Sequence, residues 1–66
     1  MYMVFKEVER IMKANGWAPV YRIGFQYHYR KAGCESPAPI PDLGGRALPI
    51  DILENLQKIT GLSFSG

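Results

Sequence analysis

The sequence predicts an α+β fold in which two amphipathic helices pack on one face of a small antiparallel sheet. Apolar residues recur at helical spacing near both ends of the chain, whereas the middle alternates between apolar and polar residues. A proline-rich segment then offers a third extended stretch before the second helix. The predicted order is therefore α-β-β-β-α, and the helices bury their apolar stripes against the sheet.

The length and composition predict a single small domain over residues 1–66. A chain of this size buries only about 60% of its unfolded surface, so we expect no deep cofactor cleft and no cofactor. The net charge of +2 permits contact with phosphate groups without requiring it. Cys34 is the only cysteine, which excludes a disulfide framework and a Cys/His metal site. We therefore expect no metal. No apolar run is long enough for a membrane span or signal peptide, so we expect a cytoplasmic protein.

The first helix is expected over residues 4–15. Its apolar stripe consists of Phe5, Val8, Ile11 and Met12. No Ser, Thr, Asp or Asn precedes it, so its first turn should lack a side-chain cap. Asn15-Gly16 should end it, because glycine readily takes the left-handed conformation of a helix C-terminus.

Residues 18–30 alternate with period two and are expected to form a hairpin that turns at Ile23-Gly24. In that register Arg22 pairs with Phe25, and Tyr21 pairs with Gln26. The side chains expected against the helices are Ala18, Val20, Phe25, Tyr27 and Tyr29. Those expected toward solvent are Tyr21, Gln26, His28 and Arg30.

Two readings fit the proline-rich segment at residues 36–41. Pro37, Pro39 and Pro41 alternate, so their missing N–H groups all point one way, and the segment can be a strand at the sheet edge. An extended connector without strand pairing fits equally well. Pro49 then suits the start of the second helix, and Gly61 should end it. Its apolar stripe consists of Ile52, Leu53, Leu56 and Ile59.

The aromatic residues are expected mainly in the core. The set comprises Phe5, Trp17, Phe25, Tyr27 and Tyr29. Phe25 has a second interpretation, because a phenylalanine exposed at a hairpin tip can mark a contact with another protein.

Three motifs together resemble the HicA (YcfA-like) toxin family of messenger-RNA interferases. They are Asn15-Gly16-Trp17, Gly24-Phe25-Gln26-Tyr27-His28-Tyr29-Arg30, and the segment from Pro49 to Gly61-Leu62. The family pattern runs helix, Asn-Gly-Trp, strand, Gly-Ser-His-X-X-Tyr, strand and a Pro-Gly-Thr-Leu-Arg helix. The resemblance implies a double-stranded-RNA-binding-domain-like fold, metal-independent cleavage of messenger RNA, and a HicB-like antitoxin that covers the outer sheet face.

The family's catalytic histidine corresponds to Gln26 in this chain. An amide can hold a phosphate by hydrogen bonds but cannot act as a general base, whereas an imidazole takes and gives protons near neutrality. His28 lies two residues further on the same strand face, about 7 Å away, and is the alternative catalytic candidate. The cations nearest the predicted hairpin and the loops after it are Arg22, Arg30, Lys31 and Arg46, and Tyr21 lies among them as a ring that can stack on a base. Together with Gln26 and His28 they form the predicted RNA-binding set. An ordinary solvated rim is the alternative interpretation of the four cations.

Two functional hypotheses follow from this comparison. The first is a HicA-like toxin that binds RNA and cleaves it as an endoribonuclease. The second is a catalytically inactive, diverged member that binds RNA or only a protein partner. Gln26, Phe25 and Glu54 favour the second hypothesis, because each departs from the family pattern.

Overall fold

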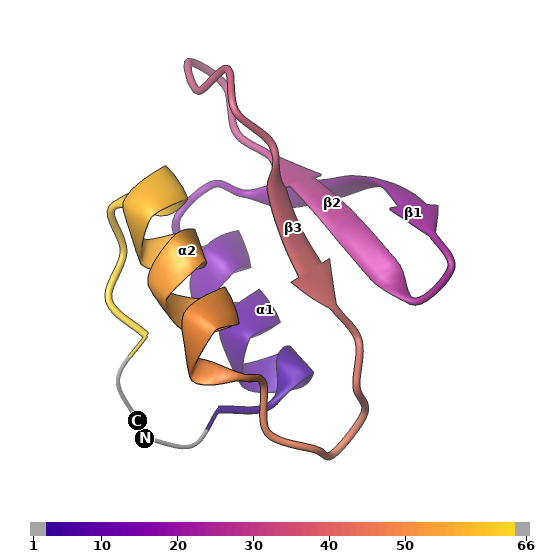
Figure 1. Cartoon of the computed structure of the whole chain (residues 1–66). Helices are drawn as coiled ribbons and strands as arrows, with labels where there is room; N and C mark the ends of the chain where they lie inside the picture. The colour runs from indigo at the N-terminus through magenta and orange to yellow at the C-terminus, as the bar shows by residue number, and fades with distance from the viewer. Residues whose placement is uncertain (1–2, 65–66) are drawn as a thin grey trace.

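A computed structural model describes residues 3–64 of the chain. The elements are α1 (Phe5–Ala14), β1 (Ala18–Ile23), β2 (Gln26–Arg30), β3 (Ala38–Pro41) and α2 (Ile50–Thr60). The strands form one antiparallel sheet in the order β1-β2-β3, and both helices lie on the same side of it (Figure 1). This arrangement confirms the predicted α-β-β-β-α fold, with two helices on a three-stranded sheet.

Helix α1 presents Phe5, Val8 and Met12 to the core, as its periodicity predicts. Val4 supplies no side-chain cap, in agreement with the sequence. The carboxylate of Glu7 instead accepts a 3.1 Å hydrogen bond from the Val4 N–H, which satisfies one donor at this end. At the other end Gly16 has φ of 89°, so the chain can reverse before the buried Trp17.

The hairpin turns at Gly24-Phe25, so the predicted turn at Ile23-Gly24 is wrong. Ile23 pairs with Gln26, and Arg22 pairs with Tyr27. Gly24 has φ of +61°, and no residue other than glycine has positive φ in the described part of the chain. This pattern matches a type II′ turn, which takes glycine at its first central position; a β-branched isoleucine there would be strained.

A β-bulge at Val20 changes the faces that β1 presents. Pro19 pairs with Tyr29 and Tyr21 pairs with His28, so Val20 has no partner of its own on β2. Ala18, Val20 and Phe25, which were expected against the helices, are all exposed. The predictions for these three residues are wrong because one extra residue in β1 and the later turn shift the register.

The proline-rich segment is an edge strand, which decides between the two readings. Ile40 pairs with Tyr27 and Pro39 with His28. The Asp42 N–H donates a 2.8 Å hydrogen bond to the Phe25 carbonyl, so the even-numbered backbone groups face β2. The backbone of the prolines therefore faces the free edge, where a missing N–H breaks no sheet hydrogen bond.

The core fills the space between the helices and the inner side of the sheet. Its buried members are Met3, Phe5, Val8, Met12, Trp17, Tyr29, Ala38, Ile40, Leu48, Leu53, Leu56 and Phe64. Helix α2 begins after Pro49 and ends at Gly61, whose φ is 74°. None of the helices in residues 3–64 has the length and apolar character that crossing a membrane requires.

Candidate functional site

The outer sheet face is the side of the sheet opposite the helices. Strand alternation and the observed register place on it Tyr21, Ile23, Gln26, His28, Arg30, Pro39 and Pro41. Tyr27 and Tyr29 point the other way, toward the helices, and Tyr29 is fully buried. The prediction that Tyr21, Gln26, His28 and Arg30 share the outer face is therefore confirmed.

Tyr21 and His28 form a stacked pair at the centre of this face. Their ring centroids are 4.4 Å apart and their planes differ by only 7°. Pro39 is the neighbour of His28 on the other side, in β3. His28 is half-buried between these two side chains, whereas Tyr21 remains 49% exposed. The exposed part of the Tyr21 ring is therefore available to stack on a ligand.

Gln26 lies on the same face, nearer the hairpin tip. Its strand neighbours are Ile23 in β1 and Pro41 in β3. The Gln26 side chain is exposed, so its amide is available to donate and accept hydrogen bonds. In the described part of the chain no carboxylate contacts His28. Gln26 and His28 thus lie two residues apart on the same face of β2, and Tyr21 neighbours His28.

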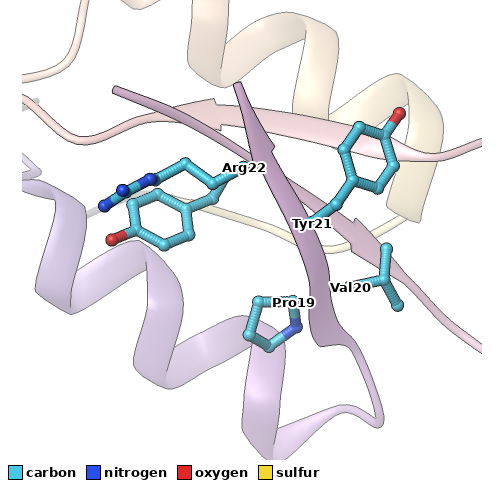
Figure 2. A pocket seen from close by; sticks show the side chains of 5 residues that line it. Pro19, Val20, Tyr21 and Arg22 are labelled. Carbon is cyan, nitrogen blue, oxygen red and sulfur yellow. The ribbon is translucent and has the colours of Figure 1, made fainter. Parts of the chain in front are cut away.

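Arg22 lies on the opposite side of β1 from Tyr21. Its guanidinium carbon is 5.8 Å from the centroid of the Tyr27 ring, a cation–π geometry. Figure 2 shows Arg22 and Pro19 on one side of the strand, and Tyr21 and Val20 on the other. These four residues and Tyr27 line a shallow hollow of about 320 Å³ at the edge of the sheet.

The other three predicted cations lie in different places. Arg30 is on the outer face, at the end of β2 that lies farthest from the hairpin tip. Lys31 follows it, and its aliphatic stem lies beside Gly16. Arg46 is in the loop after β3, and β3 ends beside Gln26 at the tip end of the sheet. Of the predicted RNA-binding residues, the structure brings together Tyr21, Gln26, His28 and Arg30 and separates Arg22, Lys31 and Arg46 from them.

Charge is distributed unevenly between the two layers. None of the residues in the three described strands is acidic. The helices contain equal numbers of acidic and basic residues, namely Glu7, Glu9, Asp51 and Glu54 against Lys6, Arg10, Lys13 and Lys58. The loops also contain equal numbers, namely Glu35 and Asp42 against Lys31 and Arg46. The net charge of +2 therefore comes from Arg22 and Arg30 on the sheet. The two arginines lie on opposite sides of the sheet, so of this pair only Arg30 adds positive charge to the outer face.

The inner side of the sheet holds one strongly perturbed titratable group. The Tyr29 hydroxyl donates a 2.7 Å hydrogen bond to Glu9 Oε2. Burial raises the pKa of Tyr29 far above its usual range, and the hydrogen bond to Glu9 raises it further. Because the Tyr29 side chain is buried beneath the sheet, we assign its hydroxyl a structural role: it joins β2 to α1. Residues 3–64 contain no cluster of His, Cys, Asp and Glu suited to a metal ion.

One feature of the outer face was not expected from the sequence. The prolines Pro39 and Pro41 line it, and their alternation with the buried Ala38 and Ile40 was the available signal. Phe25 is 63% exposed at the hairpin tip, so its expected place in the core is wrong and its ring is exposed, as its second interpretation requires. The sequence of this chain matches no protein-family model and no curated protein.

Proposed function

We propose that this protein is a HicA-like toxin that binds RNA on the outer sheet face. One observation carries the proposal: the stacked Tyr21 and His28 rings lie on a face whose strands hold no acidic residue. Exposed aromatic rings stack on unpaired bases, and nearby cations hold phosphate groups. Arg30 lies on the same face, whereas Arg22 lies on the opposite side of β1, over the Tyr27 ring.

In the catalytic form of this proposal, His28 acts on the RNA as a general base. The imidazole takes the proton of a 2′-hydroxyl as that oxygen attacks the adjacent phosphorus. The bond to the 5′-oxygen breaks, and this oxygen leaves with a proton from solvent or from the imidazolium. The Gln26 amide donates a hydrogen bond to the phosphate. The products are a 2′,3′-cyclic phosphate and a 5′-hydroxyl, and a bound metal ion takes no part.

The alternative proposal is a diverged member without catalytic activity, for which Gln26 is the supporting observation. The family's histidine position holds a side chain that does not titrate, and His28 is displaced along the strand by about 7 Å. A displacement of about 1 Å can already cost on the order of a hundredfold in rate. In this form Tyr21 and His28 hold RNA without cutting it, or a HicB-like protein partner covers them.

The deciding experiment measures binding and cleavage of a defined RNA by the purified protein in the presence of EDTA. We expect cleavage by the unmodified protein, loss of cleavage in His28→Ala, and an affinity that falls as salt rises. Cleavage only by Gln26→His would instead support the inactive form. An RNA affinity that is absent or independent of ionic strength would contradict RNA binding altogether, because phosphate contacts release counterions.

A further inference from the structure

Within residues 38–41, the free edge of β3 carries no backbone donor. The even-numbered backbone groups of this strand face β2, because the Asp42 N–H that continues the register bonds to the Phe25 carbonyl. Pro39 and Pro41 are the odd-numbered residues of β3, so their backbones face away from β2. Since proline has no N–H, another strand laid against this edge would meet carbonyl groups but no donor.

The free edge of β1 is interrupted at the position of its own proline. The odd-numbered residues of β2 turn their backbone groups toward β3, so only the even-numbered ones face β1. Pro19 pairs with Tyr29 and Arg22 pairs with Tyr27, so the backbones of Pro19 and Arg22 face the free edge. Pro19 offers no N–H there, and the bulge at Val20 places Arg22 three residues further along instead of two. This spacing does not match that of an added strand, whose edge groups repeat every second residue.

The prolines in the strands share one property, which is that the backbone of each faces a free edge. They are Pro19, Pro39 and Pro41. The other two prolines of the chain, Pro37 and Pro49, lie outside the three strands. At an inward position a missing N–H would break a hydrogen bond between strands, whereas at an edge it removes only a donor that another chain could use. The strand prolines therefore leave the sheet intact and change what its edges offer to other chains.

The exposed apolar side chains of β1 make an open edge hazardous for this protein. All six residues of β1 are exposed, and Val20 and Ile23 are 54% and 66% exposed. An exposed edge strand with apolar side chains is a template for pairing with another chain, which leads to dimers or aggregates. Proteins block such pairing with edge prolines, bulges and charged side chains, and β1 has one of each in Pro19, Val20 and Arg22.

We propose that the strand prolines and the Val20 bulge close both edges of the sheet to strand addition by a second copy of this chain. The sheet then stays three-stranded, and a macromolecule that contacts it does so through a face of the sheet and not by extending it. This property follows from the backbone positions of the prolines, so it does not depend on whether the outer face binds RNA.

The test restores the missing donors and measures the molar mass in solution. The double variant Pro39→Val/Pro41→Val gives the β3 edge two outward N–H groups and keeps apolar side chains at both positions. Pro37→Val is the matched control, because it makes the same change just before the strand. In sedimentation over a concentration series, we expect monomers for the unmodified protein and for Pro37→Val. The mass of the double variant should rise to about twice that of the monomer and stop there, because the β1 edge remains closed.

Two results would overturn the proposal. The first is a double variant that has the circular dichroism spectrum of the folded protein and stays monomeric at every concentration, because the prolines then do not keep the β3 edge closed. The second requires no variant, and it decides the question if the double variant does not fold. In a mixture of isotope-labelled and unlabelled copies of the unmodified protein, isotope-filtered NOE spectra should show no contacts between Cα protons of different copies. Such contacts across β1 or β3 would mean that the edge is open.

Discussion

Tyr29 in β2 and Glu9 in α1 are joined by a 2.7 Å hydrogen bond from the phenol hydroxyl to the carboxylate. The same oxygen of Glu9 lies 3.6 Å from the Lys13 ammonium, one helical turn away. This chain of contacts orients α1 under the central strand. These contacts therefore fix which side of β2 faces the helices. Gln26 and His28 lie on the other side as a result.

The Tyr29→Phe variant should be less stable than the unmodified protein. It keeps the buried ring but removes a hydrogen bond to a charged group, a loss of about 1–2 kcal/mol. Urea unfolding monitored by Trp17 fluorescence measures the difference. Tyr21→Phe is the matched control, because the Tyr21 ring is half exposed and its loss of a hydroxyl should change stability by less than about 0.5 kcal/mol. Equal effects in the two variants would contradict the role of the Glu9 contact.

Alkaline pH should destabilise the protein through Tyr29. Burial raises the pKa of Tyr29 in the folded state above its value of 10.0 in the unfolded chain. The folded state then binds the proton more tightly, so the contribution is complete below about pH 10 and is lost as the pH rises through the folded pKa. The free energy of unfolding should fall above about pH 10, and less steeply in Tyr29→Phe. Parallel pH profiles for the two proteins would disprove this linkage.

The Gly24→Ala variant should weaken the hairpin. Gly24 has φ of 61°, a conformation that costs an alanine about 1–2 kcal/mol, although there is open space for its methyl group. Thermal unfolding should show a lower midpoint than in Gly45→Ala, whose glycine is not in the left-handed region and also has space for a methyl group. A loss of stability confined to Gly45→Ala would be inconsistent with the II′ turn.

The position of a positive charge, rather than the total charge, should govern RNA binding. Arg30→Gln removes a cation from the outer sheet face, whereas Arg10→Gln removes one from the exposed side of α1. We expect Arg30→Gln to reduce the slope of log affinity against log salt by about 1, and Arg10→Gln to leave it unchanged. Titrations of a labelled RNA at several salt concentrations provide both slopes. Equal reductions would mean that RNA does not select the sheet.

The Tyr21→Leu variant should lose the stacking contact with His28, and it should also bind RNA more weakly. The ring lost from the stack is 4.4 Å from the imidazole, so the His28 ring-proton resonances should move in a one-dimensional proton spectrum. Loss of one aromatic platform should also weaken RNA binding by about 1–3 kcal/mol. Tyr21→Phe keeps the stack and should change neither quantity appreciably. If the His28 resonances shift but the RNA affinity does not change, the stacked pair is not part of the RNA-binding site.

The helices were predictable because their signals are local. The apolar stripes of α1 and α2, the glycines that end them and the missing side-chain cap at Val4 all agree with the structure. The alternation of Tyr27 and Tyr29 with polar neighbours also placed Gln26, His28 and Arg30 correctly on the outer face. Each of these features depends on spacing along one element, and packing did not override it.

The register of β1 was not predictable in the same way, although one signal for the turn was present. A glycine at the first central position favours Gly24-Phe25, because φ must be positive there. The bulge at Val20 has no comparable local signal. It arises where β1 pairs with β2, and it places Val20 and Tyr21 on the same side of the strand (Figure 2).

The sequence by itself determined the order of the two helices and the hairpin, the buried stripes of both helices and the outer face of β2. Only the tertiary structure decided that residues 38–41 pair as an edge strand, that Tyr21 stacks on His28, and that Arg22 lies on the opposite side beside Tyr27. The reason is that side chains in a strand alternate with period two, so the face of each β1 residue depends on its pairing with another segment. A single unpaired residue reverses that assignment, and pairing between segments is a property of the folded chain.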